Sequence, residues 1–241
     1  MLLKVYHLFG RILRLFPKTI KLDTYAMRAN FFVPINCHYI CDDLAKMKGG
    51  KREPKLYQWL SQLPKDSVYF DIGTSFGQEV CLASSLKEQN VKVIGFDCNL
   101  YHSHFCCLNK KLNDDRFEFI FSAVSDKSGQ MIEITTNSDT HIPHLNKKNV
   151  PYSYNVMTIS LDDFSEKNDI VPTHIKIDVD GAENLVIKGA KSLLANQKVK
   201  EIFIEIDNKN IGLTEVLLSC GFNVVWEDKK TFNTDILFAR S

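Results

Sequence analysis

Short apolar runs alternate with longer segments of helical period along the chain from residue 68 onward. The apolar runs have the length of β-strands and cover residues 68–72, 91–97, about 117–122, 174–179, 200–206, 222–226 and 234–240. The segments between them predict helices over residues 78–88, 182–195 and 212–219. Strands that alternate with helices are typical of βαβ units, which build a parallel sheet. We therefore predict an α/β domain over residues 67–241.

Several segments stand outside this alternation. Near the N-terminus we expect a strand-like piece at residues 31–33, a solvated lysine-rich loop at 46–55 and a helix at 56–63. Residues 131–134 predict an extra hairpin strand, and residues 135–157 predict a long polar loop over the sheet edge. Loops of this kind often carry substrate specificity.

The first 21 residues contain basic side chains but no acid, and their apolar residues recur at helical spacing until Pro17. A basic amphipathic helix can lie on an anionic membrane surface, or it can pack on the domain or on a partner subunit. Its uncharged stretches are far shorter than the roughly 20 residues that cross a bilayer, and no small-residue cleavage site is present. We predict that residues 1–66 form this helix and a cap. The expected location is the cytoplasm, and peripheral contact at the inner membrane face through residues 1–21 stays open.

Residues 174–183 read His-Ile-Lys-Ile-Asp-Val-Asp-Gly-Ala-Glu and combine the apolar frame of a buried strand with charged residues. Side chains alternate between the faces of a strand, so Lys176, Asp178 and Asp180 are predicted to share one face. Burying a lysine and a carboxylate is costly unless each has a partner. Glu205, on the neighbouring predicted strand, is the partner that we expect for Lys176. Open α/β sheets bind their ligands at this end of the strands.

A second ligand-binding pattern lies in residues 68–77, where an apolar strand runs into a turn with two glycines. Gly73 permits a tight turn, and Gly77 lets the backbone approach a ligand at the start of the next helix. The following strand ends in Asp97, an acid placed to accept both hydroxyl groups of a ribose. Together these features predict a site for an adenosine-containing ligand.

We predict that this ligand is S-adenosyl-L-methionine. The chain contains neither the Gly-x-Gly-x-x-Gly pattern of dinucleotide sites nor a Gly-x-x-x-x-Gly-Lys-Ser/Thr phosphate loop. Asp71, Asp97 and Asp178 at successive strand ends would form a negative cleft that suits a sulfonium and an ammonium group. Two other functions stay open at this point: a nucleotide- or NAD-dependent enzyme, and a non-catalytic scaffold that retains the fold.

The same residues belong to a longer series of motifs that resembles the FkbM-type S-adenosylmethionine-dependent methyltransferases, from about residue 68 to residue 241. The matching pieces are residues 70–77, 95–97, Asn109, 122–126, 158–164, 175–183, 189–190 and 204–205. The chain departs from the family pattern at Thr74-Ser75, where Ala-Asn is usual, and at Asp97-Cys98, where Glu-Pro is usual. Asp180 also stands where Glu is usual. These replacements keep hydrogen-bonding or charge character and leave the substrate open.

The resemblance implies a Rossmann-like class I methyltransferase fold with a seven-stranded, mostly parallel sheet, helices on both faces and an antiparallel last strand. An N-terminal helical appendage would complete the chain. The resemblance also implies methyl transfer to a hydroxyl, often of a sugar, a glycan or a polyketide. Such a reaction needs an aligned acceptor and is helped by a nearby base, for which Asp178 is our first choice.

These considerations give three sets of candidate residues. For cofactor contacts we predict Asp71, Gly73, Thr74, Ser75, Gly77, Asp97, Cys98, Ala123 and Asp178. For catalysis we predict Asp178, Lys176 and His144. For substrate binding we predict Asp180, Glu183, Glu205 and His141. Asp178, Asp180 and Glu205 could instead hold Mg²⁺, but Lys176 already supplies positive charge, so we predict no metal.

Composition narrows the range of partners. The formal net charge is +1, and no aromatic-basic RNA-binding pattern is present, so we expect no nucleic acid partner. The seven cysteines are scattered along the chain, which favours reduced thiols over a zinc site. We expect a small-molecule or glycan acceptor, and an oligomer stays open.

Overall fold

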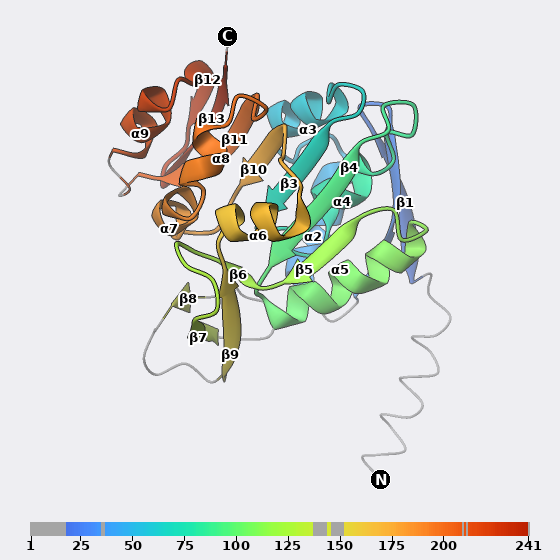
Figure 1. Cartoon of the computed structure of the whole chain (residues 1–241). Helices are drawn as coiled ribbons and strands as arrows, with labels where there is room; N and C mark the ends of the chain where they lie inside the picture. Colours follow the sequence, from blue (N-terminus) through green and yellow to red (C-terminus); the bar gives the residue numbers. More distant parts are fainter. Residues whose placement is uncertain are drawn as a thin grey trace.

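The computed structural model describes residues 18–34, 37–136, 144–145, 152–208, 210 and 212–240, with only the backbone of residues 144 and 145. A seven-stranded sheet lies at its centre, with helices on both sides (Figure 1). In spatial order the strands are β12 (Asn223–Lys229), β13 (Asn233–Ala239), β11 (Glu201–Asp207), β10 (His174–Ile177), β3 (Val68–Ile72), β4 (Lys92–Asp97) and β5 (Glu118–Phe121). Only β13 runs antiparallel to its neighbours, β11 and β12. The predicted α/β fold with a mostly parallel sheet is therefore confirmed.

Each face of the sheet has its own core. Phe70, Ile175 and Ile204 lie on one face and pack against a group of helices in the C-terminal half of the chain. These helices are α6 (Leu161–Asn168), α7 (Glu183–Lys188), α8 (Lys191–Ala195) and α9 (Leu213–Ser219). Tyr69 and Phe203 lie on the opposite face, in a core with helices of the N-terminal half. These are α2 (His38–Lys48), α3 (Pro54–Ser61), α4 (Gln78–Ala83) and α5 (Leu100–Leu112).

The polar residues of the central strands lie on the second of these faces. Alternation along β3 places Asp71 with Tyr69, and alternation along β10 places His174 and Lys176 on that same face. Their neighbours in the strands are apolar and belong to the other core. The N-terminal half of the chain therefore covers a face that carries charge.

The N-terminal segment is built into this second core. Its hairpin of β1 (Thr19–Thr24) and β2 (Met27–Phe32) packs with β2 against α4 and α5. The backbone N–H of Phe32 donates to Oδ1 of Asn109 (2.7 Å), and Nδ2 of Asn109 donates to the carbonyl of Phe76 (2.8 Å). The strand-like piece predicted at 31–33 is thus the end of a longer hairpin, and the appendage is not purely helical. Residues 1–17, on which the predicted basic amphipathic helix falls, lie outside the described residues.

A second, smaller sheet flanks the main one (Figure 1). It contains β6 (Ala123–Val124), β9 (Tyr152–Ile159), β7 (Met131–Thr136) and β8 (His144–Leu145). The extra strand predicted at 131–134 is present, but the polar loop predicted over 135–157 is wrong in part, because β9 begins at Tyr152. Val156 of this strand is buried with Ala123 and Ile134 in a small core of its own.

Three other boundaries differ from the prediction. The helix expected over 78–88 ends at Ala83. The helix expected over 182–195 is divided into α7 and α8 around Gly189, where a Cβ would lie 2.0 Å from the carbonyl oxygen of Ser125. The central strand ends at Ile177, and Asp180 has a φ of 51°. Asp180 therefore does not continue the strand face of Lys176, as the alternation had predicted.

Crossing a membrane requires a long and apolar helix, and no helix within the described ranges meets that requirement.

Gly73 sets how closely the ends of β3 and β10 approach each other. Its φ is 87°, and a Cβ at this position would lie 1.7 Å from the carbonyl oxygen of Asp178. Both the conformation and the lack of space require glycine. The turn after β3 and the loop after β10 are therefore in backbone contact.

Replacing Gly73 with alanine should lower the free energy of unfolding by more than about 3 kcal/mol, because the two loops must separate and the φ is unfavourable. Gly129→Ala is the matched control, since its φ is 77° but nothing lies within 4 Å of the added Cβ. That variant should lose only about 1 kcal/mol. Urea denaturation measures both values, and equal losses would refute the close approach.

Candidate active site

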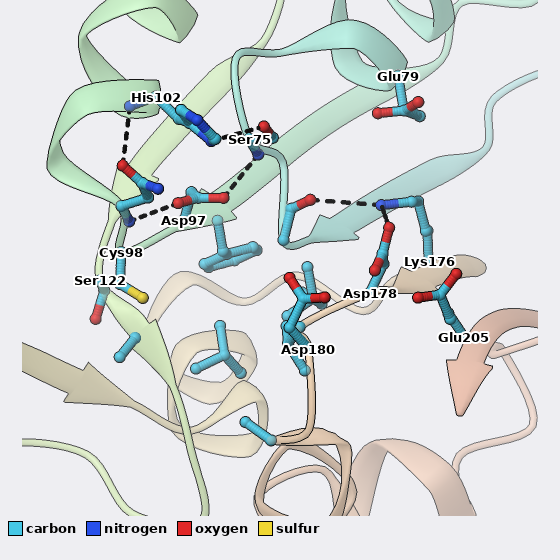
Figure 2. Close-up of a pocket in the computed structure, with 18 of the residues that line it drawn as sticks. Ser75, Glu79, Asp97, Cys98, His102, Ser122, Lys176, Asp178, Asp180 and Glu205 are labelled. Carbon is cyan, nitrogen blue, oxygen red and sulfur yellow. Dashed lines mark hydrogen bonds and ion pairs between the residues drawn. The ribbon is translucent and has the colours of Figure 1, made fainter. Parts of the chain in front are cut away.

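A cavity of about 240 Å³ lies at the carboxyl ends of β3, β4 and β10. Asp97, Cys98 and Ser122 lie toward one side of it, whereas Lys176, Asp178 and Glu205 lie toward the other (Figure 2). This is the edge at which open α/β sheets bind ligands. The two predicted motifs, the glycine turn and the lysine-bearing strand, thus meet at one site.

Asp97 is held by the two turns next to it. Its carboxylate accepts the backbone N–H groups of Ser75 (2.6 Å) and Asn99 (2.6 Å). Burial raises the pKa of Asp97 to about 6, even though both hydrogen bonds favour the ionised form. A carboxylate has about four acceptor positions, so two remain for the hydroxyl groups of a ribose.

The walls beside Asp97 suit a flat apolar group. Cys98 and Ala123 line them, and Ile132 and Ile134 of β7 add apolar surface. The hydroxyl of Tyr154 donates to the carbonyl of Cys98 (2.9 Å), which ties β9 to this wall. The residues present therefore fit an adenosine, with its base between apolar side chains and its ribose at Asp97.

Lys176 lies at the centre of the buried charges. Its side chain is 2% exposed, and its Nζ lies 3.3 Å from Oδ1 of Asp71 and 3.3 Å from Oδ2 of Asp178. Nζ also donates to the carbonyl of Gly73 (3.4 Å). Burial alone would lower the pKa of Lys176, but the acids around it raise that pKa well above its usual range. Lys176 is therefore a cation that the surrounding acids stabilise.

The predicted pairing of Lys176 with Glu205 is wrong. In the strand register Lys176 lies opposite Asp71 on one side and Phe203 on the other. Glu205 is two residues beyond Phe203, and its carboxylate pairs with Lys230 (3.2 Å), the residue that follows β12. Lys230 also contacts Asp235 (2.8 Å). The sequence predicted that Asp71 contacts the cofactor. In the structure, its carboxylate neutralises Lys176.

Asp178, Asp180 and Glu205 form a group of carboxylates at the end of the cavity away from Asp97 (Figure 2). One oxygen of each lies within 4.8 Å of the others, a spacing that could hold a metal ion. Burial and the nearby Asp178 raise the pKa of Glu205 to about 8 and that of Asp180 to about 6. The same spacing lets the group accept hydrogen bonds from several hydroxyl groups.

Not every predicted site residue lines the cavity. Gly73, Ser75, Asp97, Cys98, Ala123, Lys176, Asp178, Asp180 and Glu205 line it. Asp71, Thr74, Gly77 and Glu183 lie outside the lining. Of these, Gly77 is the N-cap of α4, where an added Cβ would lie 3.2 Å from Sγ of Cys106. Glu183 accepts the N–H of Gly181 (2.7 Å). His141 lies outside the described residues, and of His144 only the backbone in β8 is described.

The N-terminal half supplies lining residues that the sequence did not indicate. They are Tyr39, Arg52 and Glu53 from the segment before β3, and Gln78, Glu79 and His102 from α4 and α5. Oε1 of Glu79 accepts a hydrogen bond from the hydroxyl of Tyr57 (2.9 Å). Arg52 lies within the lysine-rich segment that was predicted to be a solvated loop, but its side chain is only 16% exposed. Composition alone could not distinguish this buried arginine from its exposed neighbours.

Comparison with known proteins gives one family match, to the methyltransferase FkbM domain, over residues 71–224. Among solved structures, precorrin-6y C5,15-methyltransferase from Geobacter metallireducens has 15% sequence identity and a TM-score of 0.48, covering 76% of this chain and 85% of that one. TrmK of M. capricolum, in complex with S-adenosyl-homocysteine, has 12% identity and a TM-score of 0.48 over 78% of this chain and 68% of that one. Aeropyrum pernix fibrillarin, with S-adenosyl-L-methionine bound, has 10% identity and a TM-score of 0.45 over 73% and 67%. No curated protein matches the chain.

Lys176→Met should lower the free energy of unfolding at neutral pH by about 3–5 kcal/mol, because it leaves the buried Asp71 without its cation. Adding Asp71→Asn to this variant should recover a large part of the loss, since no charge is then stranded. Chemical denaturation of the two variants and the wild type gives the comparison. A single variant as stable as the wild type would mean that the ion pair is not formed.

Glu205→Gln should change how stability depends on pH. Between the pKa of an unfolded glutamate, about 4.5, and the folded pKa of about 8, the folded wild type holds a proton that the unfolded chain has lost. Wild-type stability should therefore fall relative to the variant as pH rises through this window, by at most about 1.4 kcal/mol per pH unit, and the difference should level off above pH 8. Thermal melts from pH 4 to 9 measure it. Glu227→Gln, an exposed change on β12, is the control, and parallel profiles for all three proteins would contradict the raised pKa.

Proposed function

The chain belongs to the FkbM family of S-adenosylmethionine-dependent methyltransferases, and we propose that it transfers the methyl group to a hydroxyl of a sugar, a glycan or a related natural product. The observation that carries this proposal is the carboxylate group of Asp178, Asp180 and Glu205 at the end of the cavity opposite Asp97. A carboxyl group accepts hydrogen bonds from hydroxyl groups in either protonation state, and a compound with several hydroxyl groups would use all three.

The charge of the cavity supports a neutral or cationic acceptor. Six carboxyl groups line it, from Glu53, Glu79, Asp97, Asp178, Asp180 and Glu205. Among the described lining residues only Arg52 and Lys176 are lysine or arginine. A phosphate-rich acceptor such as a nucleic acid would meet repulsion here. The proposal is therefore a hydroxyl compound of low negative charge.

When it is bound, S-adenosylmethionine supplies a methyl group on a positively charged sulfur, which a nucleophile can accept. Asp97 would hold the ribose, and Cys98 and Ala123 would contact the base. Asp178 would orient the acceptor hydroxyl and take its proton, because it lines the cavity and is held by Lys176 at 3.3 Å. A fixed base adjacent to the acceptor contributes typically 10²–10⁴-fold to the rate. Asp180 and Glu205 would bind further hydroxyl groups of the same molecule.

The test combines binding and turnover. Wild-type protein should bind S-adenosylhomocysteine but not NAD in calorimetry, and it should transfer labelled methyl groups to members of a panel of sugars and glycans. Asp178→Asn should lower kcat by about 100-fold or more while its affinity for S-adenosylhomocysteine stays near that of the wild type. Asp228→Asn, an exposed change on β12, is the matched control and should leave both quantities unchanged.

Three results would count against the proposal. If amino groups in the panel were methylated and hydroxyl groups were not, the proposed acceptor class would be wrong. Full turnover by Asp178→Asn would remove the base role from Asp178. Binding of NAD in place of S-adenosylhomocysteine would contradict the cofactor assignment itself.

A further inference from the structure

Gln78 is a buried amide without a partner. It is the first residue of α4, it is 0% exposed, and it lines the cavity. Neither Nε2 nor Oε1 has a hydrogen-bond partner within the part of the chain that the structure describes. Buried amides are almost always hydrogen-bonded. A side chain that offers both a donor and an acceptor to a cavity therefore indicates a ligand with both kinds of group.

Arg52 brings unused donors to the same cavity. Its Nη1 lies 2.9 Å from Oδ2 of Asp43, and its Nη2 lies 3.9 Å from Oε1 of Glu53. Its Nε is buried and has no hydrogen-bond partner among the described residues. A guanidinium group has five N–H donors in a fixed plane and binds carboxylates through two of them at once. Arg52 can therefore keep Asp43 and still bind an anion in the cavity.

The other cation of the cavity is already surrounded by acids. Nζ of Lys176 lies 3.3 Å from a carboxylate oxygen of Asp71 and 3.3 Å from one of Asp178, and it donates to the carbonyl of Gly73. A carboxylate that enters a cavity lined by six carboxyl groups needs a cation. Among the described lining residues, Arg52 is the cation whose side chain still has free N–H donors.

The position of Gln78 relates this pair to the ribose site. Ser75 donates its backbone N–H to Asp97 (2.6 Å), and Gln78 follows three residues later as the first residue of α4. Glu79, the next residue, lies among the charges that raise the pKa of both Arg52 and Lys176, although burial opposes both shifts. Arg52 and Gln78 thus line the same cavity as Asp97, and Gln78 does so from the helix that follows the turn after β3.

We infer that Arg52 and Gln78 bind the α-amino-acid end of the cofactor. Arg52 and Nε2 of Gln78 donate to its carboxylate, and Oε1 of Gln78 accepts from its ammonium group. The inference rests on S-adenosylmethionine as the cofactor, but not on the identity of the methyl acceptor. Since Arg52 precedes the matched residues 71–224, the N-terminal cap completes the cofactor site.

Two ligands that differ only at this end provide the test. S-adenosylhomocysteine carries the amino-acid group, whereas 5′-methylthioadenosine keeps the adenosine and lacks that group. Arg52→Gln and Gln78→Met should each weaken S-adenosylhomocysteine binding by about tenfold or more, the loss expected for a hydrogen bond to a charged group. Calorimetry should give an unchanged dissociation constant for 5′-methylthioadenosine with both variants.

Gln78→Met also separates a binding role from a structural one. The change removes two buried polar atoms that have no partner and keeps the volume of the side chain, so the melting temperature of the ligand-free protein should stay the same or rise. Arg52→Lys covers the case in which Arg52→Gln does not fold, because it keeps a charge beside Asp43. It should retain 5′-methylthioadenosine binding and bind S-adenosylhomocysteine less tightly than the wild type. Lys51→Gln, at the exposed neighbouring position, is the control and should bind both ligands like the wild type.

The outcomes distinguish this inference from the proposed function. Equal losses for both ligands would show that Arg52 and Gln78 only maintain the fold, and unchanged binding of S-adenosylhomocysteine would show that they do not touch its amino-acid end. Either result overturns the inference and leaves methyl transfer intact. A wild-type protein that binds neither ligand would overturn the cofactor assignment and the inference together.

Discussion

A single buried ammonium group holds the carboxyl edge of the sheet in place. Nζ of Lys176 joins Asp71 on β3, Asp178 after β10 and the carbonyl of Gly73 in the turn between β3 and α4. A buried charge is tolerated only while its partners stay close, so these three segments cannot move apart independently. Ser75 follows Gly73 in the same turn and donates to Asp97. The lysine therefore also fixes the distance between the ribose site and the carboxylate group at the far end of the cavity.

This constraint explains why the N-terminal segment is part of the same core. The polar side chains of β3, β10 and β11 lie on one face of the sheet, and a purely apolar cover would leave them without partners. The cap supplies one such partner, because Nε1 of Trp59 donates to Glu201 of β11 (2.6 Å). Its Tyr57 also donates to Glu79 of α4 (2.9 Å), which lies on the same side of the sheet. The opposite face needs no such partners, because its strand residues are apolar.

The sequence predicted the parts of the fold that local patterns determine. Strand β3 has its predicted bounds, and Asp97 lies where a strand followed by a turn had placed it. Local sequence patterns could not predict the ion pairs, because the partner of Lys176 depends on which strands are neighbours and in what register. Glu205 was the predicted partner, whereas the register of β3 beside β10 places Asp71 opposite Lys176. Arg52 was missed for a related reason, since its burial depends on how the cap folds onto a domain that is distant in the sequence.

The charge of the cavity has a consequence for turnover. Burial raises the pKa of Asp97, Asp180 and Glu205, which means that the ionised form of each carboxyl group is held in the cavity at an energetic cost. A positively charged sulfur relieves that cost, and methyl transfer converts it to a neutral thioether. With the sulfonium bound beside them, these acids would stabilise the cofactor more than its product. Arg52 and Gln78 contact an amino-acid group that transfer leaves unchanged, so they bind both forms equally. Discrimination between cofactor and product would then rest on the carboxylates, and the cap would contribute affinity for both forms without favouring either.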